Sequence, residues 1–187
     1  EYPFPLTAPA CCPVARPGCH HARKRLAAQM AKISAVHAEA ETGNLKAQFE
    51  LGRLYQKGDL GTGDLAKAFQ WYSKAAGKGH AGAQYNLGLM HARGEHVRQD
   101  YFRASEWYRL AANMGWHEDA QFALGDLYFR VRGVPNVFAE ALDWYSKAAA
   151  QGHPMAQYRL GVMYADGRGV PQDDVEAAKW YRLAAEQ

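Results

Sequence analysis

What the sequence lacks limits the kinds of protein it can be. No stretch of 18 or more apolar residues occurs, so we expect no membrane-spanning helix. Charge of one sign is not in excess either, because 22 basic residues face 19 acidic ones. Nucleic-acid-binding domains usually carry a basic stripe. The one basic cluster here, Arg16, Arg23, Lys24 and Arg25, is typical of a solvated N-terminal segment. We therefore expect no binding to nucleic acid.

Motifs of the common catalytic and nucleotide-binding sites are also missing. There is no H-E-x-x-H metal motif, no G-x-S-x-G nucleophile elbow and no phosphate-binding loop. Asp166 and Asp173 flank the segment GRGVPQ, but capping of a helix is sufficient to explain Asp173. We therefore expect a protein that is not an enzyme and that uses no cofactor.

Cysteine is scarce and confined to one segment near the N-terminus, CCPVARPGCHH. Its side chains Cys11, Cys12, Cys19, His20 and His21 are soft metal ligands, but a zinc site normally combines pairs from two separate segments, and only one is present. A disulfide from Cys19 to Cys11 or Cys12 is favoured over free thiols and over a metal or redox site. It would leave one thiol that could join the chain to a partner or a second copy.

The first residue is Glu1, and no signal peptide follows it. This start favours proteolytic maturation or a trimmed chain, and maturation would accompany export. We therefore expect an exported or periplasmic protein, with the cytoplasm as the alternative. The upstream sequence would decide between them.

Internal repetition is what the sequence has in abundance. The first half of the repeat reads AQFELGRLYQKG, AQYNLGLMHARG, AQFALGDLYFRV and AQYRLGVMYADG. The second half reads AFQWYSKAAGKG, ASEWYRLAANMG, ALDWYSKAAAQG and AAKWYRLAAEQ. Both halves recur at intervals of 36, 37 and 36 residues, as shown by the first-half alanines Ala47, Ala83, Ala120 and Ala156. Spacing this regular predicts four copies of one structural unit.

Each half has the periodicity of an amphipathic helix. In the first half, Ala47, Leu51, Leu54 and Tyr55 fall at i, i+4, i+7 and i+8, which places them on one stripe. We call the first helix of each repeat the A helix and the second the B helix. The predicted C-terminal glycines are Gly58, Gly94 and Gly167 for A helices and Gly79, Gly115 and Gly152 for B helices. The predicted N-caps of B helices are Asp64, Asp100 and Asp173.

A glycine also stands inside every A helix, although glycine there costs about 1 kcal/mol relative to alanine. These residues are Gly52, Gly88, Gly125 and Gly161. We expect the missing side chain to admit a neighbouring helix that carries the large Trp or Tyr. Paired alanines of the B helices, such as Ala75 and Ala76, are expected to serve the same close packing.

The pattern A-x-x-x-L-G-x-x-Y, G-x-G-V and D-x-x-x-A-x-x-W-Y-x-x-A-A-x-x-G resembles the Sel1-like repeat, a relative of the tetratricopeptide repeat. The fourth copy, AQYRLGVMYADGRGVPQDDVEAAKWYRLAA, is nearly a full match, and the resemblance extends from Ala47 to the end. It implies an all-α fold, an α-solenoid of four helix-turn-helix repeats. The predicted boundaries are an irregular Cys/Pro-rich segment 1–22, an N-terminal capping helix 23–43, and repeats 44–79, 80–115, 116–152 and 153–187.

Register within the repeat accounts for the internal histidines. His80 and His153 take equivalent turn positions in two repeats, and His91 stands where the other repeats have tyrosine. Equivalent positions are a whole repeat or more apart, which is too far for one metal ion. We therefore predict no metal site among the repeats.

The resemblance implies a non-enzymatic scaffold that binds a partner protein through the face of the solenoid. One alternative is a structural or assembly component of the bacterial cell envelope. Another, of a different class, is a metal- or redox-handling protein that uses the N-terminal Cys and His residues. Partner specificity is expected at A-helix positions that vary between repeats, with ordinary solvent-facing variation as the alternative. They are Glu50, Asn86, Ala123 and Arg159 in one row and Arg53, Leu89, Asp126 and Val162 in the next.

The third repeat departs most from the pattern. Val131 replaces the capping glycine, Val137 replaces the N-cap aspartate, and Trp116 stands where two other repeats have histidine. Phe129 and Phe138 lie beside the replaced turn residues. Apolar residues on a solvated turn indicate a partner contact or local repacking. We predict that Phe129 and Phe138 anchor a partner.

The last B helix raises a further expectation. The sequence ends at Gln187, directly after this helix, and no polar capping helix follows. Terminal repeats of a solenoid normally need such a cap. We therefore expect the flank around Trp180 and Leu183 to meet a partner, a second copy or further residues.

Overall fold

The structure of the chain is a computed structural model that describes residues 30–58, 63–113, 118–130 and 137–187. All regular secondary structure in these ranges is α-helical. Several residues singled out above fall outside the ranges, namely Cys11, Cys12, Cys19, His20, His21, Gly115, Trp116 and Val131.

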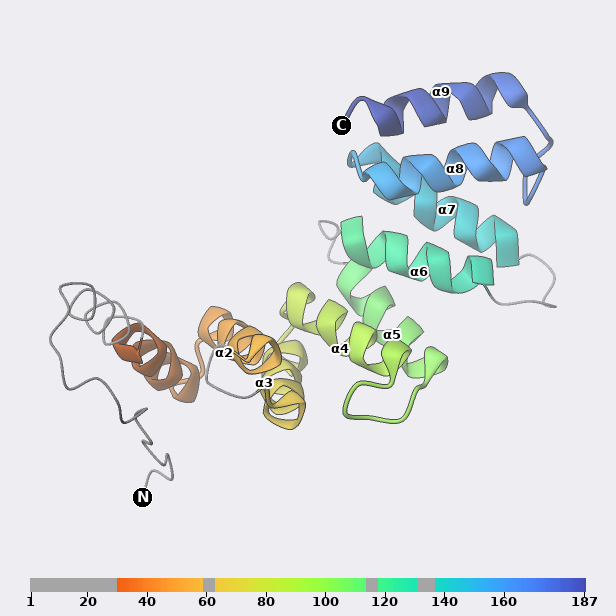
Figure 1. Cartoon of the computed structure of the whole chain (residues 1–187). Helices are drawn as coiled ribbons and strands as arrows, with labels where there is room; N and C mark the ends of the chain where they lie inside the picture. The colour runs from red at the N-terminus through yellow and green to blue at the C-terminus, as the bar shows by residue number, and fades with distance from the viewer. Residues whose placement is uncertain (1–29, 59–62, 114–117, 131–136) are drawn as a thin grey trace, which may run out of the picture.

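Helices follow one another as hairpins along a curved array (Figure 1). Residues 30–41 form the helix that precedes the first hairpin. The hairpins are α2 (Leu45–Lys57) with α3 (Leu65–Gly77), α4 (Ala81–Arg93) with α5 (Tyr101–Asn113), α6 (Glu118–Arg130) with α7 (Val137–Ala150), and α8 (Pro154–Asp166) with α9 (Asp174–Ala185). Each hairpin also packs on the next through the pairs α3–α4, α5–α6 and α7–α8. The molecule is therefore an all-α solenoid, as the sequence predicts.

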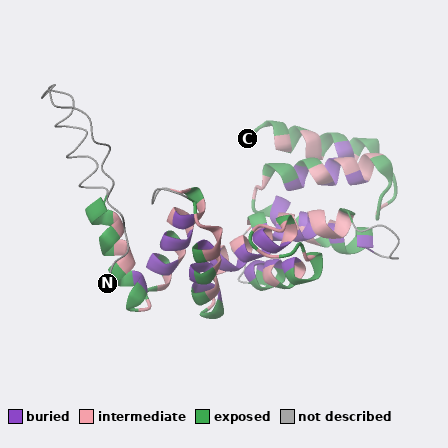
Figure 2. Ribbon diagram, turned by 60° about the horizontal axis from the view of Figure 1, so that its bottom comes forward, coloured by how far each residue is buried: buried purple, intermediate pink, exposed green. Residues whose placement is uncertain are grey.

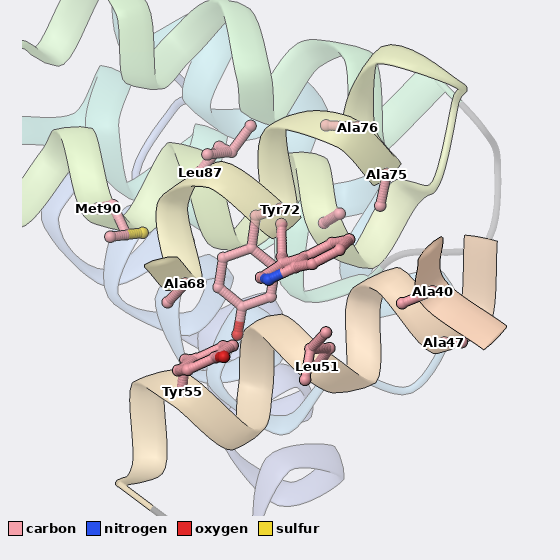
Figure 3. Close-up of a cluster of buried hydrophobic side chains, with 12 residues drawn as sticks. Ala40, Ala47, Leu51, Tyr55, Ala68, Tyr72, Ala75, Ala76, Leu87 and Met90 are labelled. Carbon is pink, nitrogen blue, oxygen red and sulfur yellow. The ribbon is translucent and has the colours of Figure 1, made fainter. Parts of the chain in front are cut away.

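The glycine inside each A helix is a point of close approach between the two helices of a hairpin. A Cβ atom on Gly52 would lie 2.6 Å from the ring of Tyr72, and one on Gly125 would lie 2.7 Å from the ring of Tyr145. Figure 3 shows Tyr72 in the first core cluster with Leu51 of the facing helix. The prediction of a close approach is confirmed. Its partner is the tyrosine of the Trp-Tyr pair, which takes the place that a Cβ would fill.

Small residues let the B helices lie against their neighbours. The paired alanines Ala75, Ala76, Ala111, Ala112, Ala148 and Ala149 are at most 4% exposed. Figure 2 shows the buried residues where helices face one another and the exposed residues on the outer surfaces. The buried residues of the described ranges consequently form several clusters between successive helices, without a single centre.

Helix ends follow the predicted caps. Asp64 accepts from the backbone N–H of Lys67, Asp100 from that of Arg103, and Asp173 from those of Val175 and Glu176. Each of these bonds satisfies an amide that has no partner inside the helix. The helices α2, α4 and α8 end in glycines with left-handed backbone conformation, Gly58, Gly94 and Gly167.

Val137 does not lie at the N-cap position that the repeat register predicts for it. The sequence alignment places it at the N-cap position of the third B helix, but it is the first residue of α7 and only 7% exposed. An apolar side chain cannot accept the hydrogen bonds of an N-cap. The side chain of Val137 is buried instead, and α7 begins at this residue.

Buried glutamines join consecutive repeats. Gln48 Nε2 donates to the carbonyl of Ala40 at 3.1 Å, Gln84 to that of Ala76 at 3.2 Å, and Gln157 to that of Ala149 at 3.4 Å. These carbonyls lie in the last turn of the preceding helix, and each also accepts from a backbone N–H of the following turn, that of Gly43, Gly79 or Gly152. The glutamine of every Ala-Gln pair is at most 6% exposed. Hydrogen bonding at the joint explains why a polar residue recurs at a buried position.

His80 and His153 are part of the same joints. Each is an N-cap whose Nδ1 accepts from a backbone N–H, of Ala83 and Ala156 respectively, at 3.2 Å. Each ring also stacks on an aromatic residue of the preceding A helix, at 4.5 Å between centroids for Phe49–His80 and 4.6 Å for Phe122–His153. Their equivalent positions therefore reflect a structural role in both repeats.

Candidate functional site

The variable A-helix positions border the buried frame of each repeat and reach solvent. Leu51 and Gly52 are buried in the first A helix, whereas Glu50 is exposed and Arg53 is half-buried beside them. In later repeats the row residues Asn86, Leu89, Ala123, Asp126, Arg159 and Val162 are all half-buried. We call this surface the A-helix face. It presents different side chains from a backbone arrangement that repeats.

At the first repeat the A-helix face carries a small polar network. Arg53 Nη1 lies 3.0 Å from Glu50 Oε1, and the hydroxyl of Tyr72 donates to Gln56 Oε1 at 2.8 Å. Burial raises the pKa of Tyr72 to about 12, although a hydrogen bond with Asn86 opposes the rise. The hydroxyl therefore stays protonated at neutral pH and acts as a fixed donor beneath the surface.

At the third and fourth repeats Asp126 is the centre of a charged network. Its carboxylate lies 2.6 Å from Arg130 Nε and 3.0 Å from Arg159 Nη2, and it accepts from the hydroxyl of Tyr145 at 3.3 Å. The Asp126 and Arg159 side chains are 17% and 26% exposed, so water and salt screen this pair less than they screen a surface pair, whereas Arg130 is 73% exposed. Burial and the nearby carboxylate both raise the pKa of Tyr145.

Phe129 and Phe138, the predicted anchor, lie together. Their ring centroids are 5.6 Å apart, and Phe129 also approaches Tyr145 at 6.3 Å. The guanidinium groups of Arg159 and Arg168 lie 5.8 Å and 5.5 Å from the centroid of Phe129. Phe129 is half-buried under these contacts, whereas Phe138 is 38% exposed. Of the pair, Phe138 offers the larger free surface.

Some row residues also contribute to packing. Leu89 and Ala123 contact the buried cluster of Ala104, Tyr108 and Leu124. Arg109 donates to the hydroxyl of Tyr128 at 2.6 Å and so connects α5 with α6. Leu89 and Ala123 therefore add apolar surface to the middle of the A-helix face.

In the described ranges, no group of three or more His, Cys, Asp or Glu side chains is placed to hold a metal ion. No described helix combines the length and the apolar character that crossing a membrane requires. The N-terminal Cys and His residues, which carry the metal and redox alternative, lie outside the described residues.

Comparisons with known proteins agree with the geometry. The Sel1 repeat model matches residues 45–80, 81–116, 118–153 and 154–187. No curated protein matches the chain.

Among solved structures, c5321, a protective antigen of uropathogenic Escherichia coli strains with an SLR fold, is 42% identical with a TM-score of 0.79. The match covers 83% of this chain and 33% of c5321. A Sel1 repeat protein from Oxalobacter formigenes is 34% identical, covering 85% of this chain and 62% of that one, with a TM-score of 0.75. A putative Sel1 repeat protein from Klebsiella pneumoniae is 27% identical, covering 82% and 73%, with a TM-score of 0.58.

This chain spans less than two thirds of the length of the first two structures. The four matched segments coincide with the hairpins and together include most of the residues. The chain belongs to the Sel1 repeat family.

Proposed function

We propose that this protein is a non-enzymatic scaffold that binds a partner protein through the A-helix face. Sel1-repeat proteins are generally protein-interaction scaffolds. The observation that carries the proposal is the contrast within each A helix. Leu51, Leu87, Leu124 and Leu160 are at most 1% exposed, while the row positions beside them differ from repeat to repeat and reach solvent.

The chemistry of the face indicates what kind of partner it fits. Glu50 and Arg53 provide charge at one end, and Asp126 and Arg159 provide it at the other. Leu89 gives the middle a more apolar surface. An extended protein segment with polar or charged groups at both ends and an apolar centre would match this order. Phe138 adds an exposed aromatic anchor at the edge of the third repeat.

Crosslinked affinity purification from the native source tests the proposal. The bait is the full chain, compared with a variant that carries Arg53→Ala, Leu89→Ala and Arg159→Ala on the A-helix face. A matched control carries Lys74→Ala, Leu110→Ala and Lys147→Ala on the B helices. We expect a specific partner to be lost with the face variant and kept with the control. Equal recovery with both variants would contradict the proposal.

The aromatic anchor has a separate test in the same assay. The double change Phe129→Ala and Phe138→Ala is expected to weaken recovery of the partner. Since Phe129 also packs on Tyr145, the single change Phe138→Ala separates a lost contact from a disturbed core. Unchanged recovery with both variants would remove the anchor from the proposed site.

An envelope role is the second candidate. It is supported by the 42% identity to c5321, which is described as a protective antigen of uropathogenic Escherichia coli. We propose that the protein is exported and serves in the cell envelope, where Cys11, Cys12 or Cys19 would link it to a neighbour or to a second copy. Fractionation of the native source and mass measurement with and without reductant test this. Recovery in the cytoplasm with all thiols free would contradict it.

A further inference from the structure

Two of the B helices expose a pair of apolar residues on their outer faces. Phe102 and Leu110 of α5 are 73% and 49% exposed, and Val175 and Leu183 of α9 are 69% and 44% exposed. In each helix the two residues are about two turns apart, which places them on one stripe. We call these pairs, with the residue midway between them, the α5 stripe and the α9 stripe. Exposed apolar residues grouped in this way indicate a contact surface.

Both stripes lie on a part of the repeat that remains exposed when further repeats are present. Helix α5 has a repeat before it and a repeat after it, and its stripe is still exposed. The α9 stripe takes the equivalent positions of the fourth repeat. In α3 and α7 these positions hold Ala66 with Lys74 and Ala139 with Lys147. Of the four B helices, α5 and α9 are therefore the two that carry an apolar pair.

A charged residue of opposite sign stands at the middle of each stripe. Glu106 is four residues from both apolar residues of α5, and Lys179 takes the equivalent position in α9. Both residues are exposed. Lys179 Nζ already lies 2.7 Å from Glu176 Oε2, but the Lys179 side chain is 61% exposed, and an ammonium group has three donors. It can therefore bind a second carboxylate.

These charges determine which stripes can lie side by side in two copies of the chain. Two α5 stripes would bring Glu106 against Glu106, and two α9 stripes would bring Lys179 against Lys179, so that like charges repel. An α5 stripe against an α9 stripe places Glu106 opposite Lys179. This holds whichever way the helices run, because each charge stands at the middle of its stripe. The apolar residues then meet in pairs at both ends.

The α5 stripe also borders a depression that can receive an apolar side chain. The depression is lined by Arg103, Glu106, Trp107, Arg109, Leu110 and Asn113. In α3 and α7 the residue at the position of Leu110 is a lysine over the tryptophan of its own helix, with Lys74 Nζ 3.9 Å and Lys147 Nζ 4.3 Å from the ring centroid. Trp107 has a leucine there instead. Its indole therefore offers an apolar contact to a residue such as Leu183 of a second copy.

Charges around the two stripes are complementary as well. Helices α3 and α5 with their capping residues carry five basic and three acidic residues. Helix α9 with its capping residues carries two basic and four acidic residues. Opposite net charge favours the encounter of α5 with α9 over the encounter of either helix with its own copy. The basic residues are Lys67, Lys74, Lys78, Arg103 and Arg109, and the acidic residues of α9 are Asp173, Asp174, Glu176 and Glu186.

We infer that the chain associates with itself through the α5 stripe of one copy and the α9 stripe of another. The contact is heterologous, because two different surfaces meet. A single pair of helices buries little area, so the association should be weak, with a Kd between about 10 μM and 1 mM. Both stripes lie on B helices, so the inference goes beyond the proposed function and does not depend on the A-helix face.

Sedimentation equilibrium of the full chain tests the inference. Reductant is present throughout, so that disulfides between copies cannot contribute. The average mass should rise above that of a monomer as the protein concentration increases from about 10 μM to 1 mM. High salt should weaken the association, because the pair of Glu106 and Lys179 at its centre is screened.

Charge exchange identifies the contact. Glu106→Lys and Lys179→Glu should each weaken the association about tenfold, because each places like charges opposite one another. The double variant should regain the affinity of the unmodified chain, and so should an equimolar mixture of the two single variants. Asp143→Lys is the matched control, because it makes the same change of charge at the equivalent position of α7, where no apolar pair is present. It should leave the affinity unchanged.

Several results would overturn the inference. One is a monomer mass over the whole range of concentration. Another is a double variant that stays as weak as the single variants, or an Asp143→Lys variant that is weakened as much as they are. A third is unchanged association in the double variant Phe102→Ala and Leu110→Ala, which removes the apolar residues of the α5 stripe. Circular dichroism verifies that all variants keep their helices.

Discussion

The first and third hairpins share one frame and carry different chemistry. Tyr72 and Tyr145 are both fully buried, each against the glycine of its A helix. Yet the hydroxyl of Tyr72 donates to the neutral amide of Gln56, whereas that of Tyr145 donates to the carboxylate of Asp126. The buried tyrosine and glycine, which fix where the backbone lies, can therefore stay the same while the residues of the A-helix face vary.

A second difference lies at a single position of the repeat. Gln56 of α2 corresponds to Phe129 of α6. The amide accepts a hydrogen bond from tyrosine, but the phenyl ring can only pack, and Arg159 and Arg168 lie against it. The third hairpin thus combines an apolar edge with a carboxylate at its buried tyrosine, where the first hairpin has a neutral amide.

The largest expected effect comes from the shared frame. Gly52→Ala and Gly125→Ala should each destabilise the protein by about 1 to 3 kcal/mol, because the new Cβ overlaps the tyrosine ring. Urea unfolding followed by circular dichroism measures this. Gly77→Ala is the control, since nothing lies within 4 Å of its Cβ, and it should be neutral or slightly stabilising. Equal losses for all three variants would argue against ring overlap as the cause.

An intermediate effect should distinguish the network around Asp126 in the third hairpin from the Glu50–Arg53 pair in the first. Asp126→Ala removes the shared partner of Arg130, Arg159 and Tyr145 and should cost about 1 to 2 kcal/mol. Glu50→Ala removes only a solvent-exposed ion pair and should change the stability by less than about 0.5 kcal/mol. The same urea titrations compare them. A loss at Glu50 as large as at Asp126 would show that the two networks are not energetically different.

The smallest effect concerns the second repeat, where His91 replaces the tyrosine of the other A helices. Burial lowers the pKa of His91, Arg103 lowers it further, and Asp100 opposes them. The unfolded chain then binds the proton more readily than the folded chain. The contribution of His91 to the free energy of unfolding is therefore fully present above its unfolded pKa of about 6.5, and it is lost as the pH falls below that value. His91→Tyr should flatten this dependence.

Unfolding midpoints at pH 5.5 and pH 7.5 measure the dependence in wild type and variant. The ring of His91 contacts Phe69 edge-on, with 5.9 Å between the ring centroids. An identical difference in wild type and His91→Tyr would exclude His91 as the source.

Much of the fold follows from local patterns. The helices and the B-helix N-caps are predictable because each depends on residues within one or two turns. The close approach at the A-helix glycines is predictable because a helix-destabilising residue recurs there in every repeat. The Trp-Tyr pair predicted a large ring against the helix glycine, but not which ring. Both rings belong to the same B helix, and only the rotation of that helix against its partner places tyrosine there.

Contacts between repeats were harder to anticipate. The glutamine of the Ala-Gln pair recurs in every A helix, yet its role was missed because its acceptor lies in the preceding helix. The recurrence of a polar residue on the buried stripe was the signal that could have found it. Likewise, Phe129 reads as exposed from its place beside a turn, whereas Phe138, Arg159 and Arg168 cover it.

By itself, the sequence determined the all-α solenoid, its repeat length and its family, because periodicity is a local property that recurs along the chain. Tertiary structure alone decided which tyrosine fills each glycine gap, which carbonyl each glutamine binds and how the arginines gather around Asp126. Those outcomes depend on the angle and distance between helices, which are set by packing across repeats and not by any single segment.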